Sequence, residues 1–90
     1  GLPQVDPLLF GSPAPSSSLA EVVGKMAEYA GAHVAAGGRL SHVTRHMLGL
    51  FNGLPGARRW RQILSEQSVR PDAGPDLLFE AMAGVELAAA

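Results

Sequence analysis

Between Ser18 and Gly38 the apolar residues recur every three or four positions, and this spacing constrains the fold more than any other feature of the chain. The recurring residues are Leu19, Val22, Val23, Met26, Ala27, Ala30 and Val34. Such a pattern places them in one stripe along an amphipathic helix. Ser18 and Glu21 have the spacing of a capping box, and glycines at 37 and 38 are typical of a helix end. The pattern therefore predicts one long helix that begins at Ser18.

Three shorter helices are predicted after it, over residues 41–52, 55–67 and 75–87. Each carries an apolar face at helical spacing. The sequence GLPG at 53–56 and the loop RPDAGPD separate them, and Pro55 suits the first position of a helix. No segment alternates as a strand would. We therefore predict an all-α protein whose four helices form a small antiparallel four-helix bundle.

The first 16 residues differ from the rest, because four of the seven prolines lie there. Proline removes a backbone donor and disfavours helix in the residue before it. We therefore predict that residues 1–16 are an extended connector from an absent upstream domain, and that residues 17–90 are a helical domain. No cysteine is present, which excludes disulfides and cysteine catalysis within this chain. The lack of cysteine is compatible with the cytoplasmic location that we expect.

Positive charge is concentrated in the centre of a chain whose net charge is -1. Residues 39–64 hold five arginines and no acidic residue. A face that is merely solvated usually mixes charges of both signs, as the first predicted helix does. Uncompensated arginines repel one another, and guanidinium groups suit phosphates. The segment could still be a solvated face, but an anionic partner explains the missing acids better.

Other polar and aromatic residues have weaker functional interpretations. His42 and His46 have the spacing of a metal pair on a helix, but no carboxylate lies near them in sequence, so metal binding is disfavoured. Trp60 could stack on a base, although its helical phase favours the core. Tyr29 and His33 are expected to be interhelical contacts. No catalytic constellation is visible.

The stretch HVTRHMLGLFNGLPGARRWR, residues 42–61, closely resembles the C-terminal helical domain of bacterial tRNA-dihydrouridine synthases of the A type. Such enzymes carry H-[IV]-T-R-H-M-L-G-L-F, one polar residue, and G-x-P-G-A-R-x-W-R. Asn52 is a mild departure, because glutamine is more usual there. The earlier VDPLLFG resembles the end of their preceding barrel domain.

The resemblance implies that this chain works together with a second domain of the parent protein. Family members have a TIM barrel that binds FMN and uses NADPH to reduce it, and the flavin then reduces the C5–C6 double bond of a tRNA uridine. The helical domain helps to hold the tRNA, so the implied partners are tRNA and the barrel of the same parent chain. No catalytic residue, cofactor site or metal site is expected in this chain. The residues implied to contact tRNA are His42, Arg45, Arg58, Arg59 and Arg61.

Two rival functions remain open from the sequence. The chain could be a helical protein-interaction module that binds an acidic protein. It could also be a structural domain whose arginines stay in water. Binding to tRNA and to an acidic polypeptide at two salt concentrations distinguishes the first rival from the tRNA-binding function.

Overall fold

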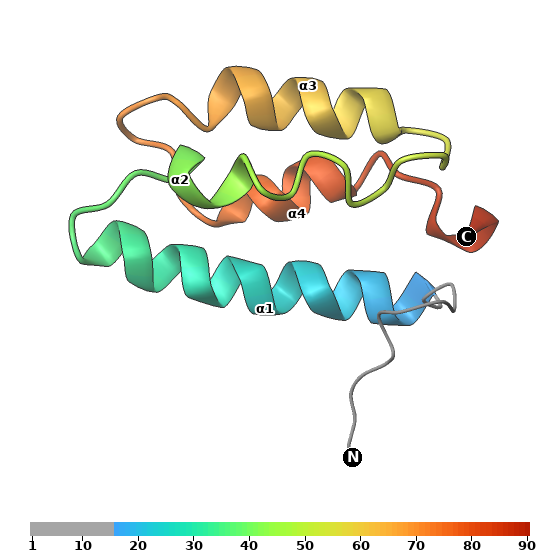
Figure 1. Cartoon of the computed structure of the whole chain (residues 1–90), viewed down its shortest axis with the longest axis horizontal. Helices are drawn as coiled ribbons and strands as arrows, with labels where there is room; N and C mark the ends of the chain where they lie inside the picture. The colour runs from blue at the N-terminus through green and yellow to red at the C-terminus, as the bar shows by residue number, and fades with distance from the viewer. Residues whose placement is uncertain (1–15) are drawn as a thin grey trace, which may run out of the picture.

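The computed structural model describes residues 16–90, with side chains from Leu19 onward. The elements are α1 (Ser16–Ala35), α2 (Ser41–Thr44), α3 (Ala57–Gln67), α4 (Asp76–Met82) and the short 3-10 helix η2 (Leu87–Ala89) (Figure 1). Residues 16–90 contain no strand, and the all-α prediction is confirmed. Within the same range no helix has the length and apolar character needed to cross a membrane. The predicted connector lies outside the described residues except for Ser16, where α1 begins.

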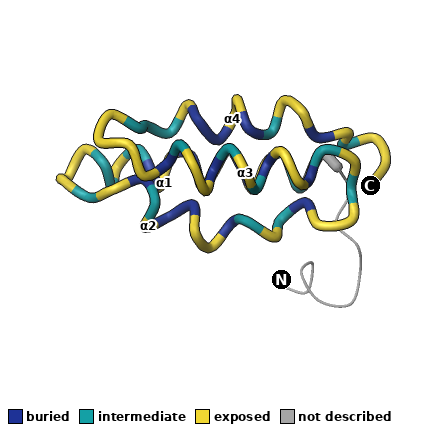
Figure 2. Tube along the Cα trace, turned by 90° about the horizontal axis from the view of Figure 1, so that it is seen from above, coloured by how far each residue is buried: buried dark blue, intermediate teal, exposed yellow. Residues whose placement is uncertain are grey.

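The elements surround one core. In Figure 1 α3 lies above α1, and in Figure 2 α4 and the segment that contains α2 lie on either side of them. The largest side chains that are almost completely buried include Trp60, Phe51, Leu40, Leu64 and Leu78. The rings of Phe51 and Trp60 meet edge to face, with centroids 4.7 Å apart. The core position that the sequence favoured for Trp60 is therefore confirmed.

The long helix ends as its glycines predict. Gly37 adopts a left-handed φ of 98°, its N–H donates to the Val34 carbonyl, and the Gly38 N–H donates to the His33 carbonyl. This pair of hydrogen bonds is a Schellman motif, which a residue without a side chain closes at least cost. At the other end the prediction was wrong by two residues. The helix begins at Ser16, so Ser18 lies within it and not at its N-cap.

The predicted helix over 41–52 is wrong beyond its first turn. After α2 the chain makes successive turns, and we call residues 45–56 the turn segment. Several of its N–H groups donate to the carbonyl three residues earlier, including those of Met47, Leu50 and Leu54. The Met47 carbonyl also accepts the indole N–H of Trp60 at 2.9 Å. This tertiary bond and the poor helix propensity of Gly49 and Gly53 together oppose a regular helix.

The last two helices are shorter than predicted for a shared reason. Gly56 has a left-handed φ of 94°, so α3 begins at Ala57 and Pro55 is not its first residue. The Pro55 carbonyl accepts the N–H of Glu86 at 2.9 Å. To reach Pro55, the chain must leave α4 after Met82, so the predicted helix over 75–87 is interrupted. Contact between the two chain segments thus fixes both boundaries.

Candidate nucleic-acid interface

The turn segment is held in place by hydrogen bonds from α3 and from Glu86 near the end of the chain. Besides the indole bond of Trp60 and the bond from Glu86, Arg61 donates from its Nη1 atom to the Asn52 Oδ1 atom at 2.7 Å. Just before the segment, the buried Thr44 hydroxyl donates to the buried Ser68 hydroxyl at 2.9 Å. These contacts fix the backbone that carries the central basic residues.

His42 and Arg45 lie together beside α1. They border a recess of about 430 Å³, which we call the α1–α2 recess. Its lining residues are Met26, Tyr29, His33, His42, Val43, Arg45 and His46. His33 Nε2 and His42 Nδ1 are 3.1 Å apart, at hydrogen-bond distance, and Arg45 Nε donates to His46 Nε2 at 3.3 Å. Two elements that are separate in sequence therefore build one polar, aromatic site.

The three arginines of α3 take different directions. Arg58 is exposed, and its helical phase is roughly opposite to that of the buried Trp60. Arg61 is half-buried against Asn52 of the turn segment. Arg59 is exposed on the other flank, where its guanidinium lies close to Gly84. The arginines thus cover the outer surface of α3 and both of its edges.

The first turn of α3 has an unusual charge. Arg58 and Arg59 lie there, no acidic residue does, and the N-cap Gly56 makes no side-chain cap hydrogen bond. The N-terminus of a helix carries a partial positive charge, so a cation there costs about 0.3–1 kcal/mol when exposed. A bound anion would relieve this repulsion. The arrangement therefore favours a negatively charged ligand over a solvated face.

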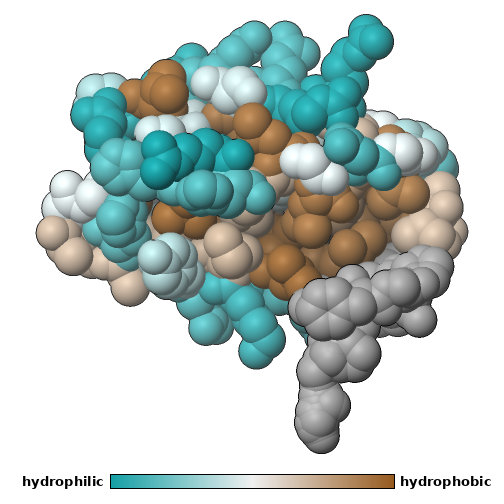
Figure 3. All heavy atoms as spheres, viewed as in Figure 1, coloured by the Kyte–Doolittle hydropathy of each residue, from teal (hydrophilic) through white to brown (hydrophobic). Residues whose placement is uncertain are grey.

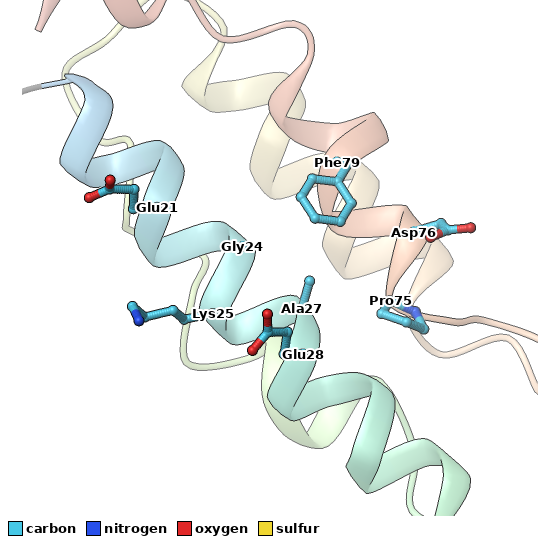
Figure 4. A pocket seen from close by; sticks show the side chains of 8 residues that line it. All are labelled: Glu21, Gly24, Lys25, Ala27, Glu28, Pro75, Asp76 and Phe79. Atoms are coloured by element: carbon cyan, nitrogen blue, oxygen red, sulfur yellow. The ribbon is translucent and has the colours of Figure 1, made fainter.

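The opposite flank of α1 has a contrasting character. A recess of about 690 Å³ lies between α1 and α4, and we call it the α1–α4 recess. Its lining contains three carboxylates, Glu21, Glu28 and Asp76, together with Lys25. In Figure 4 Phe79 reaches from α4 toward α1, whereas Glu21 and Lys25 point away from α4. The two flanks of α1 therefore differ in the sign of their charge.

The face toward the viewer in Figure 1 is not uniformly polar. Figure 3 shows hydrophobic atoms gathered between α1 and the turn segment, toward the right of the view. Val22 of α1 is 36% exposed, and Leu48 and Leu54 of the turn segment are only partly buried. Met26 of α1 is also partly buried, and it lines the α1–α2 recess.

The predicted contact residues do not form one cluster. The structure brings His42 and Arg45 together in the α1–α2 recess, and it ties Arg61 to the turn segment. Arg59 lies on the α4 side of α3. The sequence prediction did not place Tyr29, His33 and His46 beside His42 and Arg45. The spacing of Tyr29 and His33, four residues apart on one helix, was the available signal.

The expected contacts of the other polar residues were only partly correct. His33 does contact another element, because its ring meets that of His42 with centroids 5.3 Å apart. Tyr29 instead stacks on His33 of its own helix, with centroids 6.4 Å apart, and is 62% exposed. Among residues 16–90 no three histidine, aspartate or glutamate side chains are grouped so that they could hold a metal ion.

Comparison with known proteins finds relatives along nearly the whole chain. A Vibrio parahaemolyticus protein named tRNA-dihydrouridine(20/20a) synthase is 46% identical over 84 residues, which are 93% of this chain and 26% of that protein. A Shewanella oneidensis protein of the same name is 47% identical over 94% of this chain and 25% of its own length. One from Pseudomonas syringae is 58% identical over 64 residues, 71% of this chain and 19% of that protein.

The chain is homologous to one part of tRNA-dihydrouridine synthases. The resemblance seen in residues 42–61 is thereby confirmed. The chain spans about a fifth to a quarter of the length of these relatives. No family model matches it, and no solved structure matches it.

Proposed function

We propose that this chain is the C-terminal tRNA-binding domain of a flavin-dependent tRNA-dihydrouridine synthase. In this proposal the domain positions tRNA so that a uridine reaches the flavin of a barrel domain outside this chain. The uridine C5–C6 double bond is reduced there. The names of the relatives give positions 20 and 20a. These are the tRNA uridines that we propose as targets.

The single observation that carries this proposal is the homology, which extends across the basic centre of the chain. The geometry of that centre supports a polyanionic ligand. The groups that accept hydrogen bonds from Arg45 and Arg61 are an imidazole and an amide, and neither is a carboxylate. Arg58 extends into solvent from the positive end of α3. Guanidinium groups placed in this way can donate charge-assisted hydrogen bonds to phosphates.

The domain would act by contacts that position the nucleic acid and do not take part in the chemistry. Phosphate contacts from arginines fix the register and orientation of a bound nucleic acid without reading its sequence. Such contacts on α3 and beside α2 would orient the tRNA relative to the barrel. We do not propose an FMN or NADPH site among residues 16–90. The α1–α4 recess is large, but its three carboxylates would repel the phosphates of both cofactors. When bound in the barrel, these cofactors supply the hydride.

Binding of tRNA by the 90-residue chain tests the proposal. We expect Arg45→Ala and Arg58→Ala each to weaken binding by about 1–3 kcal/mol, as loss of a charge-assisted contact should. If roughly four phosphates are contacted, log Kd should change with log salt with a slope of about 3 to 4. Fluorescence anisotropy with labelled tRNA at several salt concentrations measures both quantities.

Lys25→Ala is the matched control, because it also removes one positive charge but from the α1–α4 recess. Its affinity for tRNA should stay near that of the unaltered chain. Equal losses from Lys25→Ala and Arg58→Ala would show that net charge alone governs binding. Preference for polyglutamate over tRNA would favour the protein-interaction function. No change from Arg45→Ala or Arg58→Ala would favour a structural domain.

A further inference from the structure

The α1–α2 recess has a composition that phosphate binding alone does not require. A phosphate site needs cations or amide donors, whereas this recess also presents a phenol ring and three imidazoles. Tyr29 is a large aromatic residue that is 62% exposed. No carboxylate is among the lining residues. The α1–α4 recess has three, so the two recesses would attract different ligands.

The rings of the recess are held in position by contacts with one another. The rings of Tyr29 and His33 are nearly parallel, with 5° between their planes. His33 is in turn bonded to His42 across the gap between α1 and α2. Gly38 allows this arrangement, because a Cβ atom at that position would collide with the His33 ring. The Tyr29 ring thus lies beside the His33 ring in a nearly parallel orientation, and the His33 ring is in turn bonded to α2.

The dimensions suit a single nucleotide. A volume of about 430 Å³ falls within the range of small-molecule sites, roughly 300–1,000 Å³. Proteins that recognise RNA commonly stack unpaired bases on tyrosine or histidine rings and on arginine guanidinium groups. Arg45 lies at the rim of the same recess, where a phosphate that flanks such a base would be accessible to it.

We propose that the α1–α2 recess binds an unpaired nucleotide of the tRNA, with its base stacked on Tyr29 and its phosphate contacted by Arg45. This inference rests on the proposed tRNA-binding function and adds a site for a single unstacked base. A base within a duplex cannot enter, since it is paired and stacked on its neighbours. Tyr29 and His33 then belong to the RNA-binding surface together with the arginines.

The test compares two exposed aromatic residues on opposite flanks of the molecule. Tyr29→Ala removes the proposed stacking ring, and Tyr29→Phe keeps the ring but removes its hydroxyl. Phe79→Ala removes a ring that is 45% exposed and borders the α1–α4 recess. Each variant of the 90-residue chain is titrated into labelled tRNA, after circular dichroism confirms that its helix content is unchanged.

We expect Tyr29→Ala to weaken tRNA binding about 5- to 150-fold, the range for loss of one stacked base. Tyr29→Phe and Phe79→Ala should bind within about twofold of the unaltered chain, because neither removes a stacking surface from the recess. A Tyr29→Ala variant that binds as tightly as the unaltered chain overturns the inference. If Arg58→Ala still weakens binding in that case, the proposed tRNA-binding function stands without the nucleotide site. A chain that does not bind tRNA at all overturns both.

A second measurement identifies what the ring contacts. Tyr29 is the only tyrosine, so a chain with isotope-labelled tyrosine gives one set of ring signals in an NMR spectrum. Single-stranded hexauridylate should shift these signals, and a blunt RNA duplex of equal charge should shift them much less. Equal shifts with both, or no shift with hexauridylate, would overturn the assignment of the recess to an unpaired base.

Discussion

Helix α1 and the turn segment both line the core, yet different interactions determine their shapes. α1 is a regular helix of 20 residues, whose apolar stripe and terminal glycines are local properties of its sequence. The turn segment buries Met47 and Phe51 at helical spacing but is not helical. Its backbone is bonded by the side chain of Trp60 and by the N–H of Glu86. One element is thus shaped by its own sequence and the other by its neighbours.

The difference matters because the basic residues lie on or beside the element that depends on its neighbours. Arg45 begins the turn segment, and Arg61 binds Asn52 within it. A substitution in the core can therefore change where a guanidinium group points without touching it. Substitutions that break contacts between elements should therefore lower the free energy of unfolding more than a substitution on the surface of α1.

The largest expected effect is from Trp60→Ala. Trp60 is 0% exposed and packs on Phe51, so truncating it leaves a large cavity and removes the hydrogen bond to Met47. We expect the free energy of unfolding to fall by about 3–5 kcal/mol. For a chain of this size that is much of the total stability. Urea denaturation followed by circular dichroism measures the change, because the only tryptophan is lost.

Trp60→Phe separates packing from hydrogen bonding at the same position. It keeps an aromatic ring in the core but cannot donate to the Met47 carbonyl. The cavity should be smaller than that of Trp60→Ala, and the loss of stability should be smaller as well. Equal losses from the two variants would contradict this view of the contact, as would unchanged stability of Trp60→Phe.

The next effect concerns two glycines of the turn segment with almost the same conformation. Gly56 has φ 94° and Gly53 has φ 92°. A Cβ atom at Gly56 would collide with the backbone carbonyl of Gly84, whereas one at Gly53 meets nothing within 4 Å. Gly53→Ala should cost only the left-handed conformation, about 1–2 kcal/mol. Gly56→Ala should cost more, because two chain segments must also separate.

Thermal unfolding of both alanine variants and the unaltered chain measures this difference. Gly53→Ala serves as the conformational control. Equal unfolding temperatures for the two variants would show that the contact between the Pro55 turn and the end of α4 contributes nothing. Such a result would contradict the view that this contact fixes the boundaries of α3 and α4.

The smallest expected effect lies in α1 and has the opposite sign. A Cβ atom at Gly24 would meet nothing within 4 Å, and the residue lies within the regular helix. Gly24→Ala should therefore stabilise the chain by about 0.5–1 kcal/mol, the usual advantage of alanine inside a helix. Urea denaturation measures it. A loss of stability would mean that α1 is less independent of its neighbours than its sequence indicates.

The sequence predicts those parts of the fold that local forces decide. The stripe of α1, its end at Gly37, and the buried side of α3 around Trp60 all follow from spacing. The sequence could not predict that the Met47 carbonyl bonds an indole 13 residues away, or that Pro55 pairs with Glu86. Those bonds depend on elements that meet only in the folded chain.

The candidate site also has features that the local sequence predicts and others that depend on tertiary contacts. The excess of arginine in residues 39–64 is visible in the sequence and indicates an anionic partner. Tyr29 and His33 could not be assigned to that site, because they belong to α1, and His33 meets His42 only through the turn at Gly37 and Gly38. The phase of Arg58 was predictable, whereas the bond of Arg61 to Asn52 depends on a segment whose shape was not.

The bond between Glu86 and Pro55 has a consequence for protein engineering. A peptide that copies residues 41–56 would lack both the Trp60 indole and the Glu86 N–H, whose hydrogen bonds shape this stretch. Grafting its basic residues onto another scaffold would therefore require transplanting α3 and the last residues of the chain as well. The smallest fragment that could keep this surface in its folded shape is therefore close to the whole domain.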